Sequence, residues 1–213
     1  SFPAPEMSED CLYLNIWRPS KPLEGGLPVI VYIHGGSNKG GWSFEPNYFG
    51  HNLAKKDVIV VGISYRLGVF GFFSHPFLEE TNFGLSDQVM ALEWVRDNIK
   101  SFGGDPANVT IMGESLGADH VAYLLASPLG EGLFRRAILQ SGGSSMTNGV
   151  IRPEHFRRGE LFARQIVGES RNDVIDLMRT LPAEEILQQS LSAYEGHYFE
   201  SVIDGNIVTS TLI

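Results

Sequence analysis

Short hydrophobic runs rich in valine and isoleucine recur along the first two thirds of the chain. The most continuous of them span residues 27–33, 57–64 and 134–139. Runs of this length predict strands that are buried on both faces of a sheet. Residues 11–17 alternate between hydrophobic and polar positions instead, which predicts a half-buried strand with Leu12, Leu14 and Ile16 on one face.

Helical patterns lie between these predicted strands. The clearest extends from Ser86 to Lys100, and its hydrophobic positions are spaced three, three and four residues apart at Val89, Leu92, Val95 and Ile99. Ser86 is the predicted N-cap, and the Gly-Gly-Asp-Pro sequence at 103–106 is expected to end the helix. Strands that alternate with helices predict an α/β fold, with a mostly parallel sheet and helices on both faces.

The pattern changes after about residue 145. Three amphipathic helices follow one another there without a predicted strand between them, at 152–167, 171–180 and 183–191. Helices in this arrangement are typical of an insertion that covers a sheet. We therefore expect one domain over residues 1–213, with a sheet core over 1–148 and a helical insertion or cap over 149–200.

Composition and charge narrow the possible functions. Hydrophobic residues make up 43% of the chain and charged residues 19%, which is ordinary for a globular protein with a hydrophobic core. The net charge of −9 argues against nucleic acid as a partner. No hydrophobic run approaches the length of about 18 residues that predicts a transmembrane segment.

The single cysteine and the scattered histidines argue against a metal site, and the missing phosphate-binding motifs argue against a nucleotide. Cys11 is the only cysteine, so the chain holds no internal disulfide and no zinc site built from cysteines. No H-E-x-x-H sequence and no phosphate-binding glycine motif is present. We expect no metal site and no cofactor.

The sequence Gly113-Glu114-Ser115-Leu116-Gly117 is the strongest chemical signal. It follows the hydrophobic run 109–112 and precedes a helical pattern over 118–126. This context is typical of a nucleophile elbow, a sharp turn that exposes a serine hydroxyl at the end of a strand. Only small residues fit two positions before and after such a serine, and Gly113 and Gly117 meet that demand.

A glycine-rich loop upstream suits the same chemistry. His34-Gly35-Gly36-Ser37 follows the predicted strand at 27–33, and two more glycines follow at 40–41. In an acyl-transfer enzyme, backbone N–H groups of this loop and the N–H of Leu116 would stabilise the oxyanion of the tetrahedral intermediate. The alternative interpretation is a tight turn without a catalytic role.

Several motifs in the same order resemble the type-B carboxylesterase family, which includes cholinesterases, carboxylesterases and related lipases. The stretches that carry the resemblance are Ser8–Asn15, Tyr65–Phe72, Phe102–Pro106, Gly113–Ser115, Ala137–Gly142 and, later, Val202–Gly205. The resemblance implies an α/β-hydrolase fold and a serine hydrolase that acts on small-molecule carboxylic esters. It favours secretion, although nothing else in the sequence indicates a location.

The resemblance also implies the role of each site residue. Ser115 would be the nucleophile, and Gly36, Ser37 and Leu116 would supply the oxyanion donors. The family usually has glycine where Ser37 stands and alanine where Leu116 stands, so the larger side chains here would narrow the pocket. Gly35, Gly113, Glu114 and Gly117 would support the site, and Glu114 would shape its electrostatics rather than act as the triad acid.

Three further residues are expected to have structural roles. Arg66 and Asp87 match a structural ion pair of the family, so Asp87 is expected to anchor a loop rather than act as a base. His34 is expected to be a structural residue at the end of a strand.

The acid and the histidine of the triad are expected outside this chain. In the family both residues follow the cap helices, and neither His155 nor His197 matches the family histidine. The chain is therefore expected to be an interior fragment, incomplete at both ends, with a second chain as one possible source of the missing groups. The alternatives are a non-catalytic cholinesterase-like binding or adhesion module and an inactive truncated hydrolase.

Overall fold

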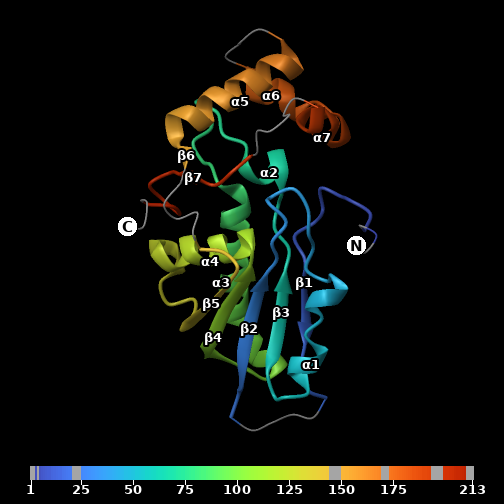
Figure 1. Ribbon diagram of the computed structural model, residues 1–213, viewed down its shortest axis with the longest axis vertical. Coiled ribbons are helices and arrows are strands. Elements are labelled where there is room, and N and C mark those ends of the chain that lie inside the picture. Colours follow the sequence, from blue (N-terminus) through green and yellow to red (C-terminus); the bar gives the residue numbers. More distant parts are fainter. Residues whose placement is uncertain are drawn as a thin grey trace.

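A five-stranded sheet forms the centre of the molecule (Figure 1). The computed structural model describes residues 3, 5–20, 25–143, 150–168, 173–192 and 199–209. The strands are β1 (Leu14–Trp17), β2 (Leu27–Ile33), β3 (Ile59–Ile63), β4 (Gly104–Glu114) and β5 (Arg136–Gln140). Their order in the sheet is β1-β3-β2-β4-β5, with β1 antiparallel to β3 and all other neighbours parallel. The predicted mostly parallel sheet is confirmed.

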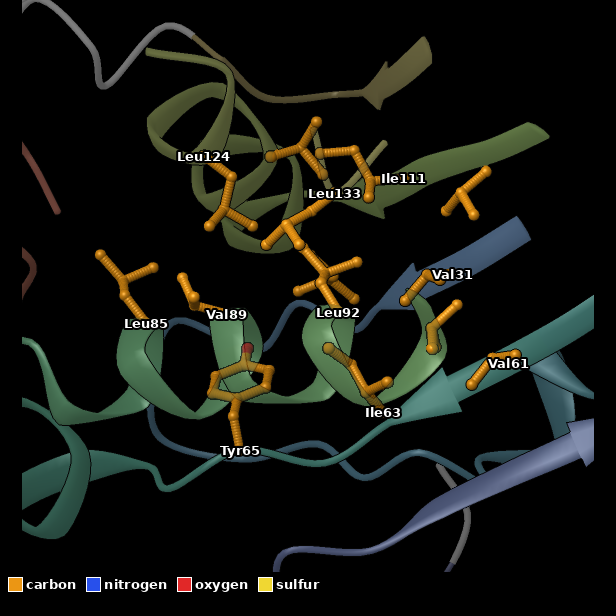
Figure 2. Close-up of a cluster of buried hydrophobic side chains, with 14 of the residues drawn as sticks. Val31, Val61, Ile63, Tyr65, Leu85, Val89, Leu92, Ile111, Leu124 and Leu133 are labelled. Carbon is orange, nitrogen blue, oxygen red and sulfur yellow. The ribbon is translucent and has the colours of Figure 1, made fainter. Parts of the chain in front are cut away.

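The helices of the sheet region pack on the buried strands. They are α1 (His51–Ala54), α2 (Gly68–Phe72), α3 (Phe83–Asn98) and α4 (Leu116–Ala126), with short 3₁₀ helices at Pro46–Tyr48, Ile99–Phe102 and Pro128–Gly130. Figure 2 shows Leu85, Val89 and Leu92 of α3 in one hydrophobic cluster with Val31, Ile63 and Ile111 of the sheet and Leu124 of α4. The predicted positions Val89, Leu92 and Val95 therefore lie on the buried face of α3. Ile99 is buried in the same core but belongs to the 3₁₀ helix that follows.

Two local predictions in this region were wrong. Ser86 does not cap α3, because the helix begins at Phe83 with Asn82 at the N-cap position. The strand predicted over 11–17 begins only at Leu14, and Leu12 is 45% exposed. Leu14 and Ile16 do pack against the core as predicted, since β1 pairs with β3 only from Leu14 onward.

The side chain of Asn82 joins the segment 202–208 to the core by hydrogen bonds. The Asn82 backbone is left-handed, with φ of 57°, and the residue is buried. Its amide nitrogen donates to the Val202 carbonyl over 2.7 Å and to the Asp204 carboxylate over 2.8 Å, and its amide oxygen accepts from the Val202 N–H over 2.8 Å. The segment 202–208 therefore joins the sheet region, where Ile207 and Val208 are buried in the same core.

The helices after residue 150 gather at one end of the molecule, with α2 between them and the sheet (Figure 1). They are α5 (Arg152–Val167), α6 (Val174–Arg179) and α7 (Ala183–Ser192). A second hydrophobic cluster holds them on α2 and on the residue after it, with Val69 and Phe73 packed beside Phe162, Val174, Met178 and Ile186. Two short strands that the sequence did not predict, β6 (Val150–Ile151) and β7 (Val202–Ile203), precede and follow these helices in the sequence and pair with each other in parallel.

The predicted ion pair between Arg66 and Asp87 is present and joins the loop after β3 to α3. The guanidinium donates to both carboxylate oxygens over 2.8 and 2.7 Å, and the Arg66 N–H donates to the same carboxylate over 3.0 Å. The Asp87 side chain is 1% exposed and that of Arg66 36%. Hydrogen bonding to Asp87 raises the pKa of Arg66, so the guanidinium stays charged throughout the working range of pH.

Replacing Asp87 by alanine is expected to lower the free energy of unfolding by about 2–3 kcal/mol. The substitution leaves three donors without their acceptor, and the partial exposure of Arg66 keeps the loss below that of a fully buried pair. Urea unfolding measures the change. Asp97→Ala is the matched control, because the Arg96–Asp97 pair is exposed on the same helix. Equal effects of the two substitutions would contradict the anchoring role of Asp87.

Candidate active site

Ser115 lies at the junction of β4 and α4 in a backbone conformation that serine rarely adopts. Its φ is 55° and its ψ is −128°, which is the region of the first central residue in a type II′ turn and is normally held by glycine. Such a conformation costs on the order of 1–3 kcal/mol and persists only where the surroundings enforce it. The turn therefore has the sharp and strained form that the G-x-S-x-G pattern predicts.

Close backbone packing on both sides enforces this turn. A Cβ atom at Gly113 would overlap the carbonyl of Gly117, and a Cβ atom at Gly117 would overlap the carbonyl of Ile33 at the end of β2. Gly142, just after β5, meets the Ser115 carbonyl in the same way. The glycines at 113 and 117 thus let α4 begin directly against the strands.

Hydrogen bonds fix the direction of the turn. The Ser115 N–H donates to the Gln140 carbonyl of β5 over 2.9 Å, and the Ser115 carbonyl accepts from Ala118 over 2.9 Å. The Asp119 carboxylate, in the first turn of α4, accepts from the Gly143 N–H over 2.5 Å. The N–H of Leu116 belongs to the first turn of α4, where a helix leaves its N–H groups without intrahelical partners. That N–H is therefore free to bind an anion next to the serine.

The glycine loop after β2 curls beside the elbow. The Gly36 carbonyl accepts from the N–H of Lys39 over 2.9 Å and of Gly40 over 3.2 Å. Ser37 and Asn38, between them, have φ values of 56° and 57°, as in a type I′ turn. Among the described residues, the N–H groups of Gly36 and Ser37 have no hydrogen-bond partner.

The loop and the elbow are in contact. A Cβ atom built on Gly35 would lie 3.1 Å from the Cβ of Ser115 and 2.6 Å from the carbonyl oxygen of Glu114. The same position is 3.4 Å from a carboxylate oxygen of Glu114, so this side chain lies along the loop. The structure therefore brings all eight predicted site residues together: Gly35, Gly36, Ser37, Gly113, Glu114, Ser115, Leu116 and Gly117.

No histidine among the described residues hydrogen-bonds to the Ser115 hydroxyl. His155 lies instead against the hydroxyl of Ser74, over 2.5 Å, and its Nε2 accepts from the Glu200 N–H over 3.2 Å. Because Nε2 is an acceptor, Nδ1 carries the proton and donates to Ser74, so His155 cannot act as a base toward that serine. His197 lies outside the described residues.

Two other histidines are buried behind the site. His34 and His120 are at most 1% exposed. Burial lowers the pKa of His34 to about 4 and that of His120 to about 3, and His34 contributes to the second shift. Burial also lowers the pKa of His155 to about 4. All three imidazoles are therefore neutral in the folded protein at neutral pH.

Acid is expected to destabilise the fold because these three histidines must stay neutral in it. An unfolded histidine binds its proton below a pH of about 6.5, whereas the folded ones do so only near 4 or below. Stability is therefore complete above about 6.5 and falls between 6.5 and 4, by on the order of 2 kcal/mol per histidine from pH 7 to pH 5.

Urea unfolding at several pH values measures this dependence. His155→Asn removes one of the three titrating groups and should flatten the profile by roughly a third. A wild-type free energy of unfolding that stays constant from pH 7 to pH 5 would contradict the assignment of neutral, buried imidazoles.

Two other kinds of site are a metal centre and a reactive thiol. The described residues contain no group of three or more histidine, cysteine, aspartate or glutamate side chains that could hold a metal ion. Cys11 is a free cysteine. Burial raises the pKa of its thiol, so the thiol is not activated as a nucleophile. No helix in the described ranges is long and hydrophobic enough to cross a membrane.

Two supporting contacts had no signal in the sequence. The bond from Gly143 to Asp119 and the packing of Gly142 on Ser115 join residues more than twenty positions apart, across the end of β5. Neither Gly142 nor Gly143 belongs to a local sequence pattern that predicts such a contact. A stretch of the family resemblance, Ala137–Gly142, ends at this point but was assigned no role there.

The chain is similar in sequence to several known esterases. The chain is 50% identical to the fumonisin B1 esterase of Sphingopyxis macrogoltabida over 143 residues, which are 64% of this chain and 26% of that protein. It is 44% identical to the para-nitrobenzyl esterase of Bacillus subtilis over 188 residues, 86% of this chain and 37% of that protein. It is 40% identical to the acetylcholinesterase of Bungarus fasciatus over 216 aligned positions, 96% of this chain and 36% of that protein.

Solved structures and a family model agree with these relatives. A structure of a PNB esterase superposes with a TM-score of 0.86 at 38% identity, over 96% of this chain and 46% of that one. The chain thus spans about a quarter to two fifths of the length of these curated relatives. The model of the carboxylesterase family matches residues 1–212. With the α/β-hydrolase sheet and the serine turn already in place, the match shows that the chain belongs to the carboxylesterase family.

Proposed function

We propose that this protein is a serine hydrolase that cleaves carboxylic esters through an acyl-enzyme on Ser115. The observation that carries the proposal is the strained turn at Ser115, which faces a glycine loop with unpaired N–H groups. A backbone that is held out of its preferred conformation at one serine, beside free donors, suits acyl transfer. The esterase relatives favour this function over a binding or adhesion module.

In the proposed reaction, the Ser115 hydroxyl oxygen attacks the ester carbonyl carbon while a base takes its proton. The carbonyl oxygen becomes an oxyanion and accepts hydrogen bonds from the N–H groups of Gly36, Ser37 and Leu116. The bond to the alcohol oxygen then breaks, and the alcohol leaves with the proton. Water attacks the acyl-enzyme in the same way and releases the carboxylic acid.

The base in this scheme is a histidine from outside the 213 residues, as is the acid that orients it. His34, His120 and His155 are each committed elsewhere, and none reaches the serine hydroxyl. The two missing groups would come from a further part of the same protein or from a second chain. The substrate class is an ester of a carboxylic acid. The side chains of Ser37 and Leu116 would narrow its pocket, because the family usually has smaller residues there.

The division into a sheet core over 1–148 and a helical insertion over 149–200 is part of the same proposal. The two separate hydrophobic clusters support it, since the second is built around α5, α6 and α7. The site residues all belong to the first part.

A fluorophosphonate probe tests the proposed function on the native protein. Such probes react with activated serines only, so a single adduct that peptide mapping places on Ser115 is expected. Prior heat denaturation should abolish the labelling. Intact mass of the same material shows whether a second chain accompanies this one. Absence of an adduct on the folded native protein would overturn the enzymatic proposal and favour a non-catalytic module or an inactive hydrolase.

A further inference from the structure

We propose that Tyr65 is a positioning residue for the oxyanion loop and that it acts through His34. The proposal deepens the function above and rests on it. Tyr65 follows β3 and belongs to the buried cluster that Figure 2 shows around α3. Its ring belongs to the hydrophobic cluster and also contacts the imidazoles of His34 and His120, and its hydroxyl group contacts the backbone from which the glycine loop departs.

The contact between Tyr65 and His34 has two parts. The Tyr65 hydroxyl donates to the His34 carbonyl over 2.7 Å, and the two rings stack with centroids 4.4 Å apart and planes 18° from parallel. Tyr65 is 3% exposed and His34 is 1% exposed, so water does not compete for this bond. Burial raises the pKa of Tyr65, and the hydroxyl therefore remains a donor at every working pH.

His34 passes this constraint to the loop. Its Nδ1 lies 2.8 Å from the Gly35 carbonyl, and since a carbonyl only accepts, Nδ1 carries the proton and donates. At the far end of the loop, Gly41 packs so closely on the ring that a Cβ atom there would overlap Nδ1. The loop from Gly35 to Gly41 is therefore wrapped around one imidazole.

The same His34 carbonyl also borders the elbow. A Cβ atom at Gly117, in the first turn of α4, would lie 2.8 Å from this oxygen. The His34 carbonyl thus has the Tyr65 hydroxyl and the start of α4 as neighbours, while the His34 imidazole contacts the glycine loop. The hydroxyl of Tyr65 therefore sets the spacing between the oxyanion donors at Gly36 and Ser37 and the nucleophile.

This role differs from ordinary core packing. A phenylalanine at position 65 would fill the same volume, and the hydroxyl oxygen adds nothing to hydrophobic burial. Oxyanion donors act only when they lie about 2.7–3.1 Å from the developing charge, and a displacement of about 1 Å can lower a rate 10²-fold. Loss of the hydroxyl should accordingly affect the transition state and not substrate binding.

Tyr65→Phe in the native protein tests the proposal. Fluorophosphonate titration first counts the active serines, and kcat and KM for p-nitrophenyl acetate are then expressed per active site. We expect kcat to fall about tenfold while KM stays within about twofold. A trifluoromethyl ketone forms an oxyanion when the serine adds to it. Its dissociation constant should rise by about the same factor as that by which kcat/KM falls. Tyr123→Phe, a buried tyrosine on α4, should change neither quantity.

Unchanged kcat per titrated site, or a loss of kcat without weaker binding of the ketone, would overturn the role of Tyr65. Failure of the proposed function is a separate result, because it appears as absence of the Ser115 adduct in the wild-type protein. A second pair of variants covers poor folding of Tyr65→Phe. His34→Gln, whose amide can donate to Gly35, should retain more activity per site than His34→Leu, and equal losses would overturn the relay.

Discussion

Ser115→Ala should lower kcat for p-nitrophenyl acetate by about 10⁴-fold or more, since no covalent acyl-enzyme can form without the hydroxyl. The fluorophosphonate adduct should disappear with it. Ser86→Ala is the matched control and should retain full activity, because this half-buried serine of α3 belongs to neither the elbow nor the glycine loop. Appreciable turnover by Ser115→Ala would show that the nucleophile lies elsewhere.

The stability of position 115 provides an independent readout. Alanine has the same difficulty as serine at a φ of 55°, so Ser115→Ala should leave the free energy of unfolding nearly unchanged. Ser115→Gly relieves the strained backbone and should raise that free energy by about 1 kcal/mol, while being equally inactive. A variant that loses all activity and gains stability identifies a conformation maintained for function. A destabilised Ser115→Gly would contradict the strain.

The buried strands and the elbow were predictable because local rules determine them. The strand over residues 27–33 was predicted with its observed bounds, since seven residues that are mostly buried leave a continuous hydrophobic signal. The turn at Ser115 was also predictable, because the space beside it admits only glycine at 113 and 117. In the strand and at Gly113 the constraint acts between residues close in the sequence. At Gly117 it comes from the Ile33 carbonyl on β2, and the short G-x-S-x-G pattern still reports it.

The remaining features depend on contacts between distant residues. Asn82 was overlooked as the start of α3 because its side chain is engaged with Val202 and Asp204, about 120 positions away, rather than with the helix. Leu12 was predicted to lie in a strand because hydrophobic and polar residues alternate around it. The pairing of β1 with β3 nevertheless begins only at Leu14. The hydrogen bond from the Tyr65 hydroxyl to the His34 carbonyl likewise has no local pattern.

Gly36→Ala is expected to lower kcat by about 10²–10³-fold. Gly36 has a φ of 106°, which a residue with a side chain rarely adopts, and a Cβ atom there would overlap the Gly40 carbonyl. The turn from Gly36 to Gly40 must therefore open, and the N–H groups of Gly36 and Ser37 would leave the position where the oxyanion forms. The rate per titrated serine for p-nitrophenyl acetate measures the loss.

Gly103→Ala separates this effect from simple backbone strain. Gly103 also has a positive φ, of 88°, but it lies at the end of the 3₁₀ helix after α3 and nothing is within 4 Å of its Cβ position. Its substitution should cost about 1 kcal/mol of stability and leave kcat unchanged. If Gly36→Ala retained kcat within about threefold of the wild type, the oxyanion donors would have to lie outside this loop, since one lost donor alone lowers kcat by about 10²-fold or more.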